Sequence, residues 1–324
     1  MDITPVTSHE DLADFCDVLA AALAADFVGL PAQPFDFWLP VVEGTERGDA
    51  RTLLWVGRDG GVPVGMVNVR VPLLDNLTSV NLEVYVHPSH RRRGHGRALV
   101  ARGVSEIAAL GRTRVFCPVA SWPDRPLPAG RLLDEHGFRP VVEDTRRMID
   151  FREHPAGPGG PLPSAYRIEQ WVETAPEELV EGLAYLSGRM STDPPMGDMD
   201  YEPEVWDAAR YREMEADAVQ RKQQRYATAV VHESGQVAGF TDIAVRLTAP
   251  EVAEQWSTIV DPDHRGHGLG LVLKRWNHAL LAERAPEVRF LNTWNASSNS
   301  FMIEVNEAVG YRAMETWTEY QLDL

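Results

Sequence analysis

The sequence predicts two tandem copies of one α/β fold, each a mixed β-sheet flanked by helices. A strand ending in Val-x-Pro, a glycine-rich loop and an apolar helix occur in that order twice along the chain. A Gly-aromatic pair follows each series, at Gly137-Phe138 and Gly310-Tyr311. Gly94 of the first loop lies 43 residues before its pair, and Gly268 of the second lies 42 residues before its own. An ordered series of features at matched spacing indicates an internal repeat.

Between the two copies lies a stretch that favours neither helix nor strand. Residues 154–164 contain four prolines and three glycines, residues that interrupt regular structure. We therefore expect an N-terminal domain over residues 1–153, a linker over 154–164 and a C-terminal domain over 165–324. The total of 324 residues fits two domains of ordinary size.

Each copy is predicted to begin with a helix followed by three strands. Alanine-rich segments with acidic residues predict helices at 12–25 and 176–189. Alternation of apolar and polar residues predicts strands, and their ranges are 52–58, 62–71 and 78–86, then 227–233, 236–247 and 252–260. Asp59-Gly-Gly61 and Ser234-Gly235 separate the first two strands of each set and are typical of hairpin turns.

A second helix is predicted after each glycine loop, at residues 96–110 and 268–283, and a further strand after each helix, at 114–119 and 288–294. Apolar residues at helical spacing give the first of these helices one buried face. The residues of that face are Leu99, Val100, Val104, Ile107 and Ala108. Strands and helices in this order predict a mixed sheet with flanking helices, twice.

Composition and charge argue against several classes of function. With 48 acidic and 31 basic residues the formal net charge is −17, which disfavours a general nucleic-acid binder. No apolar stretch near the N-terminus is long enough to cross a membrane, and no basic signal segment precedes one, so we expect a cytoplasmic protein. The two cysteines form no disulfide framework and the ten histidines lack metal-ligand spacing, so no metal site is expected.

The glycine loops are candidate anion-binding sites. At the start of a helix the first backbone N–H groups have no partner within the helix, and the helix dipole favours negative charge there. Glycines let an anion such as a pyrophosphate approach the backbone. The alternative is a plain strand-to-helix turn with a surface arginine, because the short motif alone is weak evidence.

In this context the chain resembles the GNAT family of acyl-CoA-dependent N-acetyltransferases, in a tandem arrangement of the mycothiol-synthase type. The second copy is the closer match, with Val260-Asp-Pro262, then Arg265-Gly-His-Gly268-Leu-Gly270, then Asn295 and Asn299. The resemblance implies acetyl-CoA as cofactor. It implies contacts to coenzyme A from Thr258, Ile259, Val260, Arg265, Gly266, His267, Gly268, Leu269, Gly270, Asn295 and Asn299. For Asn295 the alternative is the N-cap of the last helix.

The first copy offers a second possible coenzyme site but departs further from the family pattern. The residues of this possible site are Val86, Arg91, Arg92, Arg93, Gly94, His95 and Gly96. Three prolines, Pro123, Pro126 and Pro128, interrupt the region where the second copy has its asparagines. We therefore expect this copy either to bind coenzyme A without catalysis or to support the second copy.

The same resemblance suggests catalytic roles in the second copy. Glu254, six residues before Val260, stands where some members have a basic glutamate, and a backbone N–H near Thr258 is expected to stabilise the oxyanion. The alternative for Glu254 is an ordinary solvated strand residue. The usual acidic tyrosine is replaced by Asn306, so the thiolate leaves unassisted or with help from another residue such as Tyr311.

The acceptor is expected to be a small, cationic primary amine. Residues 173–217 contain 13 acidic and three basic residues, and Asp198, Asp200 and Glu202 are candidate acceptor contacts. The alternative for these residues is a solvated acidic loop. The alternative function is a non-catalytic acyl-CoA-binding or sensor protein. Neither nucleic acid nor membrane is expected as a partner, and monomer and homodimer both stay open.

Overall fold

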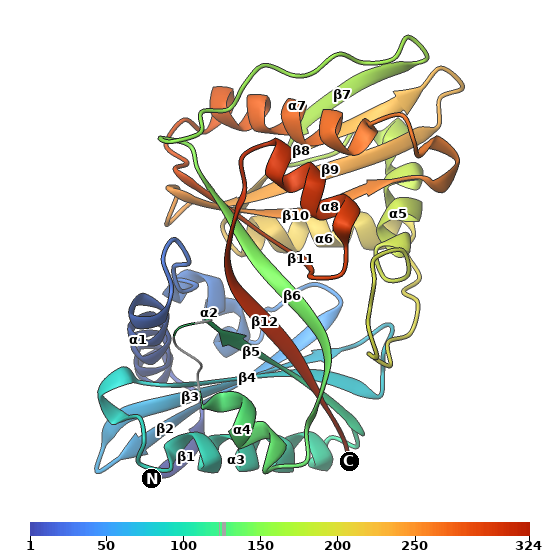
Figure 1. Cartoon of the computed structure of the whole chain (residues 1–324). Coiled ribbons are helices and arrows are strands. Elements are labelled where there is room, and N and C mark those ends of the chain that lie inside the picture. Colours follow the sequence, from blue (N-terminus) through green and yellow to red (C-terminus); the bar gives the residue numbers. More distant parts are fainter. Residues whose placement is uncertain (123, 125–127) are drawn as a thin grey trace. The chain divides into compact units, whose positions relative to one another are not determined.

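The computed structural model describes residues 1–122, 124 and 128–324, and these divide into two compact units (Figure 1). Unit 1 contains Met1–Asp144, Gly197–Glu202 and Glu315–Leu324, and unit 2 contains Thr145–Met196 and Pro203–Met314. Unlike the contiguous division expected at the linker, each unit therefore includes chain from both halves of the sequence. Of the three prolines expected to interrupt the first copy, Pro123 and Pro126 lie outside the described residues.

Unit 1 is a sheet with helices on both faces. Its strand order is β1-β2-β3-β4-β5-β12. The bounds of its strands are β1 Asp2–Pro5, β2 Ala50–Asp59, β3 Val62–Pro72, β4 Ser79–Val86, β5 Arg114–Ser121 and β12 Arg312–Asp323. Its helices are α1 His9–Asp26, α2 Phe35–Glu43, α3 His95–Ala109 and α4 Ala129–Asp134, with a short 3-10 turn at Pro88–His90.

Two apolar cores position these helices. Leu12, Phe15 and Trp38 of α1 and α2 pack with Met66 on one face of the sheet. Leu99 and Ile107 of α3 pack on the other face with Val67, Leu82 and Val115. The sequence therefore predicted α3 and the buried residues Leu99, Val100 and Ile107 correctly, whereas Ala108 of the expected face is exposed. Ser8 supplies a side-chain cap for α1.

Unit 2 repeats this architecture, with strand order β6-β11-β10-β9-β8-β7. Its strands are β6 Arg139–Asp150, β7 Tyr166–Val172, β8 Gln223–His232, β9 Val237–Arg246, β10 Val252–Val260 and β11 Phe290–Ala296. Of β6, the residues from Thr145 on belong to unit 2 and those up to Asp144 to unit 1. Its helices are α5 Val180–Arg189, α6 Ala208–Gln220, α7 Leu269–Arg284 and α8 Ser300–Ala308, with 3-10 turns at Glu177–Leu179 and Pro262–His264. The prediction of a mixed sheet with flanking helices in each copy is confirmed, whereas the helices α2 and α6 and the strands β1, β6, β7 and β12 were not foreseen.

The last strand of each copy is exchanged. β5 of the first copy pairs antiparallel with β12 from the end of the chain, from Thr316 opposite Ser121 to Asp323 opposite Arg114. In unit 2, β6 of the first copy is the neighbour of β11 in the strand order. Each unit is therefore completed by a strand from the other copy, which explains why the units are not contiguous in sequence.

Both sheets open at the same place in their topology. The parallel strands β4 and β5 pair only from Ser79 to Asn81, and β10 and β11 pair only from Val252 to Glu254. Beyond these points the two strands of each pair diverge. This leaves an opening in the middle of each sheet, next to the glycine loop that follows β4 or β10.

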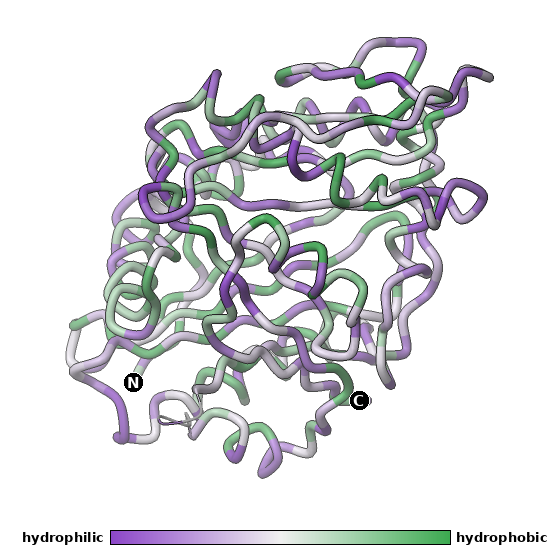
Figure 2. The backbone as a smooth tube through the Cα atoms, turned by 45° about the horizontal axis from the view of Figure 1, so that its top comes forward, coloured by the Kyte–Doolittle hydropathy of each residue, from purple (hydrophilic) through white to green (hydrophobic). Residues whose placement is uncertain are grey.

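Hydrophobic residues alternate with polar ones along the helices and strands, whereas the outer loops are mostly hydrophilic (Figure 2). Within the described residues no helix is long and apolar enough to span a membrane.

Candidate active site

Each glycine loop ends in a glycine that begins a helix. Gly94 and Gly268 are the N-caps of α3 and α7, with φ of 86° and 70°, and neither provides a side-chain cap. The first intrahelical bond of α7 is donated by the N–H of Val272 to Gly268, so the preceding N–H groups of the first turn have no partner within the helix. A Cβ atom built on Gly268 would meet nothing within 4 Å. The loop therefore presents backbone donors to open space, as a pyrophosphate site requires.

One arginine of each loop contacts the strand before it and a carboxylate. Arg265 donates to the Val260 carbonyl oxygen at 3.3 Å and to Asp193 at 2.5 Å. In unit 1, Arg91 makes the same pair of contacts, to the Val86 oxygen at 3.1 Å and to Asp26 at 3.0 and 2.7 Å. These guanidinium groups hold the loops in place, so the anion contacts come from the backbone.

A β-bulge lies in β10 beside its opening. The register against β9 shifts between Gln255 and Thr258, and the N–H of Ser257 donates to the buried Asp242 carboxylate at 3.0 Å. The N–H of Asp261 also points to β9, where it donates to Ala238. Because alternate N–H groups point to opposite edges of a strand, those of Thr258 and Val260 point towards β11, from which β10 has diverged.

These two N–H groups are therefore directed into the opening, Thr258 deeper along the strand and Val260 nearer the glycine loop. The side chain of Ile259, between them, is buried at 5% exposure. An extended ligand that runs from the glycine loop along this edge of β10 would pass Val260 before it reaches Thr258. Thr258 and Val260 are therefore candidate donors along this edge of β10.

Glu254 is the last residue of β10 paired with β11, and its side chain is 19% exposed at the head of the opening. Its carboxylate forms an ion pair with Arg246 of β9, which orients it. Trp256, two residues on, is 56% exposed. The sequence alone gave no reason to single out Trp256 from the other tryptophans, because its exposure depends on the bulge.

The asparagines behave differently from one another. Asn299 accepts from the Met302 N–H at 3.1 Å and caps α8, so the alternative that Asn295 is the cap is wrong. Asn295 is 9% exposed, and its Oδ1 accepts from Asn306 Nδ2 at 3.0 Å. Asn306, at the position of the usual tyrosine, is fully buried, so this pair joins β11 to α8 within the unit.

Tyr311 is placed poorly for acid catalysis. It is 2% exposed in the core with Leu281 and Leu291, and burial raises the pKa of its hydroxyl well above the ordinary value. A phenol that holds its proton so strongly, away from solvent, does not donate readily to a leaving thiolate. The structure therefore opposes the expected role of Tyr311, and Asn306 has no proton to give.

Beside Tyr311 lies an unusual buried lysine. Lys274 of α7 is 1% exposed, its Nζ is 5.2 Å from the Tyr311 ring centre, and burial lowers its pKa to about 7. His278, one turn later, is also buried, with its pKa lowered to about 3 by burial and by Lys274. At the same distance from its own glycine the first copy has the apolar Val100. The buried ammonium therefore opposes folding.

We expect Lys274→Met to raise the free energy of unfolding by about 2–4 kcal/mol at pH 7. Because the pKa is about 7 in the folded protein and near 10.5 in the unfolded chain, the unfolded chain binds more protons between these values. The free energy of unfolding of the parent therefore increases as the pH rises through this window. The difference in this free energy between the parent and Lys274→Met narrows towards pH 10.

Urea denaturation of both proteins at pH 7 and pH 10 measures this difference. Lys222→Met is the matched control, because Lys222 is the only other lysine and is exposed; its effect should stay within about 0.5 kcal/mol at both pH values. A Lys274→Met protein no more stable than the parent at pH 7 would contradict the expectation.

The acidic loop expected at the acceptor site belongs to unit 1. Asp200 forms an ion pair with Arg114, and the Glu202 N–H donates to Asn76 at 2.7 Å. Asp198 is exposed, and its N–H donates to the Val141 oxygen at 2.9 Å. The charge of Asp200 is thus compensated, and the three residues belong to unit 1, whereas Glu254 belongs to unit 2.

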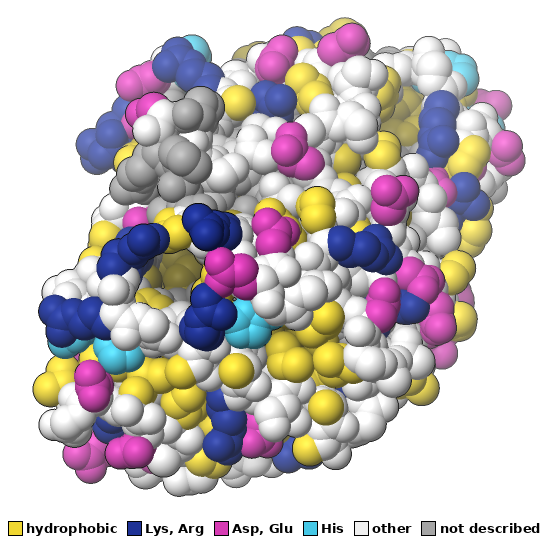
Figure 3. All heavy atoms as spheres, turned by 60° about the horizontal axis from the view of Figure 1, so that its bottom comes forward, with side chains coloured by type: hydrophobic (Ala, Val, Ile, Leu, Met, Phe, Trp, Pro, Cys, Tyr) yellow, Lys and Arg dark blue, Asp and Glu magenta, His cyan; other side chains and the backbone are white. Residues whose placement is uncertain are grey.

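The possible coenzyme site of unit 1 has the loop but not the bulge. β4 keeps a regular register against β3 from Asn81 to Val86. Arg92 has φ of 64°, a strained conformation for a non-glycine residue, and Arg93 donates to the Ser89 oxygen at 3.2 Å. The His95 side chain is buried, so only its backbone N–H is available to a ligand. On the face shown in Figure 3, basic side chains gather around a hydrophobic hollow.

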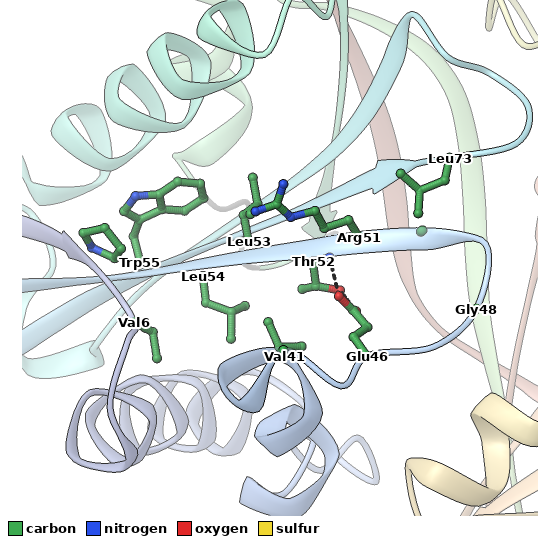
Figure 4. A pocket seen from close by; sticks show the side chains of 13 residues that line it. Val6, Val41, Glu46, Gly48, Arg51, Thr52, Leu53, Leu54, Trp55 and Leu73 are labelled. Carbon is green, nitrogen blue, oxygen red and sulfur yellow. Dashed lines mark hydrogen bonds between the residues drawn. The ribbon is translucent and has the colours of Figure 1, made fainter.

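A separate cavity of about 450 Å³ lies in unit 1 along β2 (Figure 4). Its lining is mostly apolar, including Val6, Val41 and Leu54. Its carboxylate, Glu46, already accepts from the N–H of Thr52 at 2.8 Å and from its hydroxyl. The carboxylate of this cavity is therefore committed to Thr52, and Arg51 is the other charged residue of the lining.

The glycine loops, the diverging strands and the bulge define an acyltransferase class of fold and site. The model of the Acetyltransferase (GNAT) family matches residues 21–138 and 196–311, so the chain belongs to this family. It is an acetyl-CoA-dependent acetyltransferase built from two GNAT units.

The chain is similar over most of its length to two mycothiol acetyltransferases and to one solved tandem GNAT structure. It is 28% identical to the mycothiol acetyltransferase of Cellulomonas flavigena over 280 residues, which cover 80% of this chain and 71% of the relative. The enzyme of the same name from Salinispora arenicola is 26% identical, with 97% and 95% covered. A tandem GNAT protein from the clavulanic acid biosynthesis pathway has a TM-score of 0.82 at 26% identity, with 99% and 98% covered.

Proposed function

We propose that unit 2 transfers an acetyl group from acetyl-CoA to the primary amine of a small, cationic acceptor. The observation that carries this proposal is the bulge in β10, which directs the Thr258 and Val260 N–H groups into the opening beside β11. In unit 1 the corresponding strand β4 has no such bulge. Bulges are frequent next to active sites because they redirect backbone groups.

Residues of unit 2 suit each part of the coenzyme. The unpaired N–H groups at the start of α7 suit the pyrophosphate, the edge of β10 at Val260 suits the extended arm, and Thr258 lies further along the same edge. When bound, acetyl-CoA supplies an activated thioester whose carbonyl carbon accepts the nucleophile.

The reaction requires a free amine and a stabilised oxyanion. The cationic acceptor loses one proton to Glu254, directly or through a water molecule, and its free nitrogen then forms a bond to the carbonyl carbon. The same nitrogen loses its second proton to water as the thiolate leaves, which gives the neutral amide. The Thr258 N–H stabilises the negative oxygen that develops. The carbon–sulfur bond breaks and the thiolate leaves without a protein acid, since Asn306 and Tyr311 are both unsuited to that role. Thiolates are adequate leaving groups near neutral pH.

Three features support a cationic acceptor. The Glu254 carboxylate lies at the head of the opening, and the exposed Trp256 ring lies on the same strand two residues away. Aromatic faces attract ammonium groups. The net charge of −17 attracts cations to the protein as a whole. The relatives named mycothiol acetyltransferase favour a small-molecule acceptor over a protein.

Unit 1 is proposed to bind coenzyme A without turnover or to complete the fold. Its loop offers the N–H groups at the start of α3, and exposed arginines, Arg92, Arg93 and Arg97, surround them. The strand exchange makes unit 2 dependent on β6 of the first copy.

An acceptor panel tests the proposed function. Release of free thiol from acetyl-CoA is expected with cationic glucosamine at about tenfold higher kcat/KM than with zwitterionic glycine or anionic glutamate at low salt. The preference should shrink at high salt, where the screening length falls to a few ångströms. Absence of thiol release with all amines, or a preference for glutamate, would contradict the proposal.

A further inference from the structure

Three half-buried carboxyl groups of unit 1 take no part in the proposed reaction. They are Glu83 on β4, Asp144 on β6 and Glu319 on β12. Within the part of the chain that the structure describes, none of the three forms an ion pair. By contrast, the buried carboxylate of Asp242 in unit 2 is paired with Arg225.

Two of these residues flank the opening of the unit 1 sheet. β4 and β5 pair as far as Asn81 and Phe116. Glu83 stands two residues beyond Asn81 on β4. Glu319 of β12 is opposite Pro118, which stands two residues beyond Phe116 on β5. The two carboxyl groups therefore stand at the same level, Glu83 on β4 at the edge of the opening and Glu319 on β12, one strand beyond β5.

Both side chains also point to the same face of the sheet. Met66 and Tyr85, which are opposite one another in register, pack with the core of α1, and Glu83 is two residues from Tyr85. On β12, Tyr320 packs with the core of α3, so Glu319 beside it points to the opposite face. Glu83 and Glu319 thus share the face that α1 covers.

Unsatisfied acceptor atoms lie beside this opening. Asn68 is 8% exposed and donates from Nδ2 to Glu83 at 3.0 Å, while its own Oδ1 is buried without a partner. Oε1 of Glu319 is also buried without a partner. A buried polar atom without a hydrogen bond costs about 1–3 kcal/mol. The amide oxygen of Asn68 can only accept, and Glu319 can only accept once it is ionised, so a group that donates would satisfy both atoms.

The local charge favours a cation. Burial, Asp144 and Glu83 together raise the pKa of Glu319 to about 8, and burial raises the pKa of Glu83 and of Asp144. Arg70, whose charge acts on Glu83, is itself paired with Asp49 at 2.9 Å. A bound cation would allow these carboxyl groups to ionise together.

Aromatic rings beside the carboxyl groups favour an organic cation over a metal ion. Trp317 is two residues from Glu319 on the same face of β12, and Phe27 stacks on it with ring centres 5.3 Å apart. Trp122 is 5.2 Å from Phe27. Among the described residues no cluster of three or more His, Cys, Asp or Glu is placed to hold a metal ion. Ammonium groups on aromatic faces are a common form of recognition.

We propose that this opening of unit 1 is a second ligand site, which binds a small organic ammonium compound through Glu83, Glu319 and Asn68 beside the Trp317 ring. The ammonium N–H groups would satisfy the acceptors that are now without partners. This site goes beyond the proposed function, which concerns the opening of unit 2.

Isothermal titration calorimetry of the full chain with 1,4-diaminobutane at pH 7 and low salt tests this site. We expect binding to the parent, with affinity at least about tenfold weaker in Glu319→Gln. Because the Glu319 pKa is about 8, this carboxyl is largely protonated at pH 7 and should lose its proton when a cation binds. The parent should therefore release protons, seen as different heats in buffers of different ionisation enthalpy, and Glu319→Gln should release far fewer.

Two controls keep the result specific. Glu143→Gln should bind as the parent does, because Glu143 is next to Asp144 on β6 but exposed. The neutral 1,4-butanediol should not bind. Equal affinity of the parent and Glu319→Gln, equal binding of the diol, or tighter binding of Mg²⁺ than of the diamine would each overturn the proposal.

Glu319→Gln is expected to fold, since it removes an unpaired carboxyl group, and circular dichroism verifies this. Glu254→Gln distinguishes binding of the diamine in unit 1 from binding in unit 2. If the diamine binds in unit 1, this variant should release as many protons on binding as the parent does. A failure of this site therefore leaves the proposed acetyl transfer intact, and a failure of acetyl transfer leaves this site intact.

Discussion

Gly268→Glu is expected to weaken acetyl-CoA binding by at least about 100-fold, or about 2.7 kcal/mol. The new carboxylate would stand at the N-cap of α7, where a pyrophosphate meets unpaired N–H groups, and would replace attraction by repulsion. The φ of 70° at this position also disfavours any residue with a Cβ. Calorimetric titration with acetyl-CoA measures the loss, with circular dichroism to verify the fold.

Two variants separate charge from strain and unit 2 from unit 1. Gly268→Ala adds only the strain of the left-handed conformation, about 1 kcal/mol, and should keep most of the affinity. Gly94→Glu places the same charge at the N-cap of α3 and should leave turnover within about threefold of the parent, because unit 1 is not proposed to catalyse. Loss of turnover in Gly94→Glu, with turnover retained in Gly268→Glu, would show that unit 1 is the catalytic unit and would contradict the proposal.

Glu254→Gln is expected to lower kcat/KM by about 10²–10⁴ at neutral pH. Glutamine keeps the size of the side chain and can still contact Arg246, but it cannot take the proton of the acceptor. Raising the pH supplies free amine from solution, so the variant should recover part of its rate while the parent changes less. Initial rates of thiol release from pH 6.5 to 9.5 give both profiles.

Glu251→Gln is the matched control for this experiment. Glu251 is exposed immediately before β10 and carries the same charge, so a general electrostatic effect would appear in both variants. A Glu254→Gln enzyme within about threefold of the parent at every pH would remove Glu254 from the mechanism. Its ion pair with Arg246 would then serve only to join β9 and β10.

Much of the fold followed from local patterns in the sequence. The helix after each glycine loop was expected at 96–110 and 268–283, and α3 and α7 occupy His95–Ala109 and Leu269–Arg284. A 3.6-residue apolar repeat and a glycine that adopts positive φ are properties of a few consecutive residues, so they can be recognised without a structure. The repeat of these features along the chain gave the two copies for the same reason.

The partners of the strands were decided only by the tertiary structure. An alternating pattern shows which residues of a strand share a face but not which strand will lie beside it. Because the copies resemble each other, nothing local in residues 312–323 indicates that β12 completes unit 1 by pairing with β5. The linker therefore suggested a contiguous division that differs from the two compact units.

The same distinction holds for the site residues. Gly268, Val260 and Glu254 were recognisable because the glycine motif and its spacing lie within some fifteen residues of one another. The bulge that directs the Thr258 N–H, the ion pair of Asp200 with Arg114 and the burial of Tyr311 depend on residues distant in sequence. The carboxyl groups of Glu83 and Glu319 are 236 positions apart and share one opening only because β12 folds back beside β5. Sequence alone thus determined the repeated fold and its loops, whereas long-range strand pairing decided which side chains meet, because that pairing is set by packing of the whole chain.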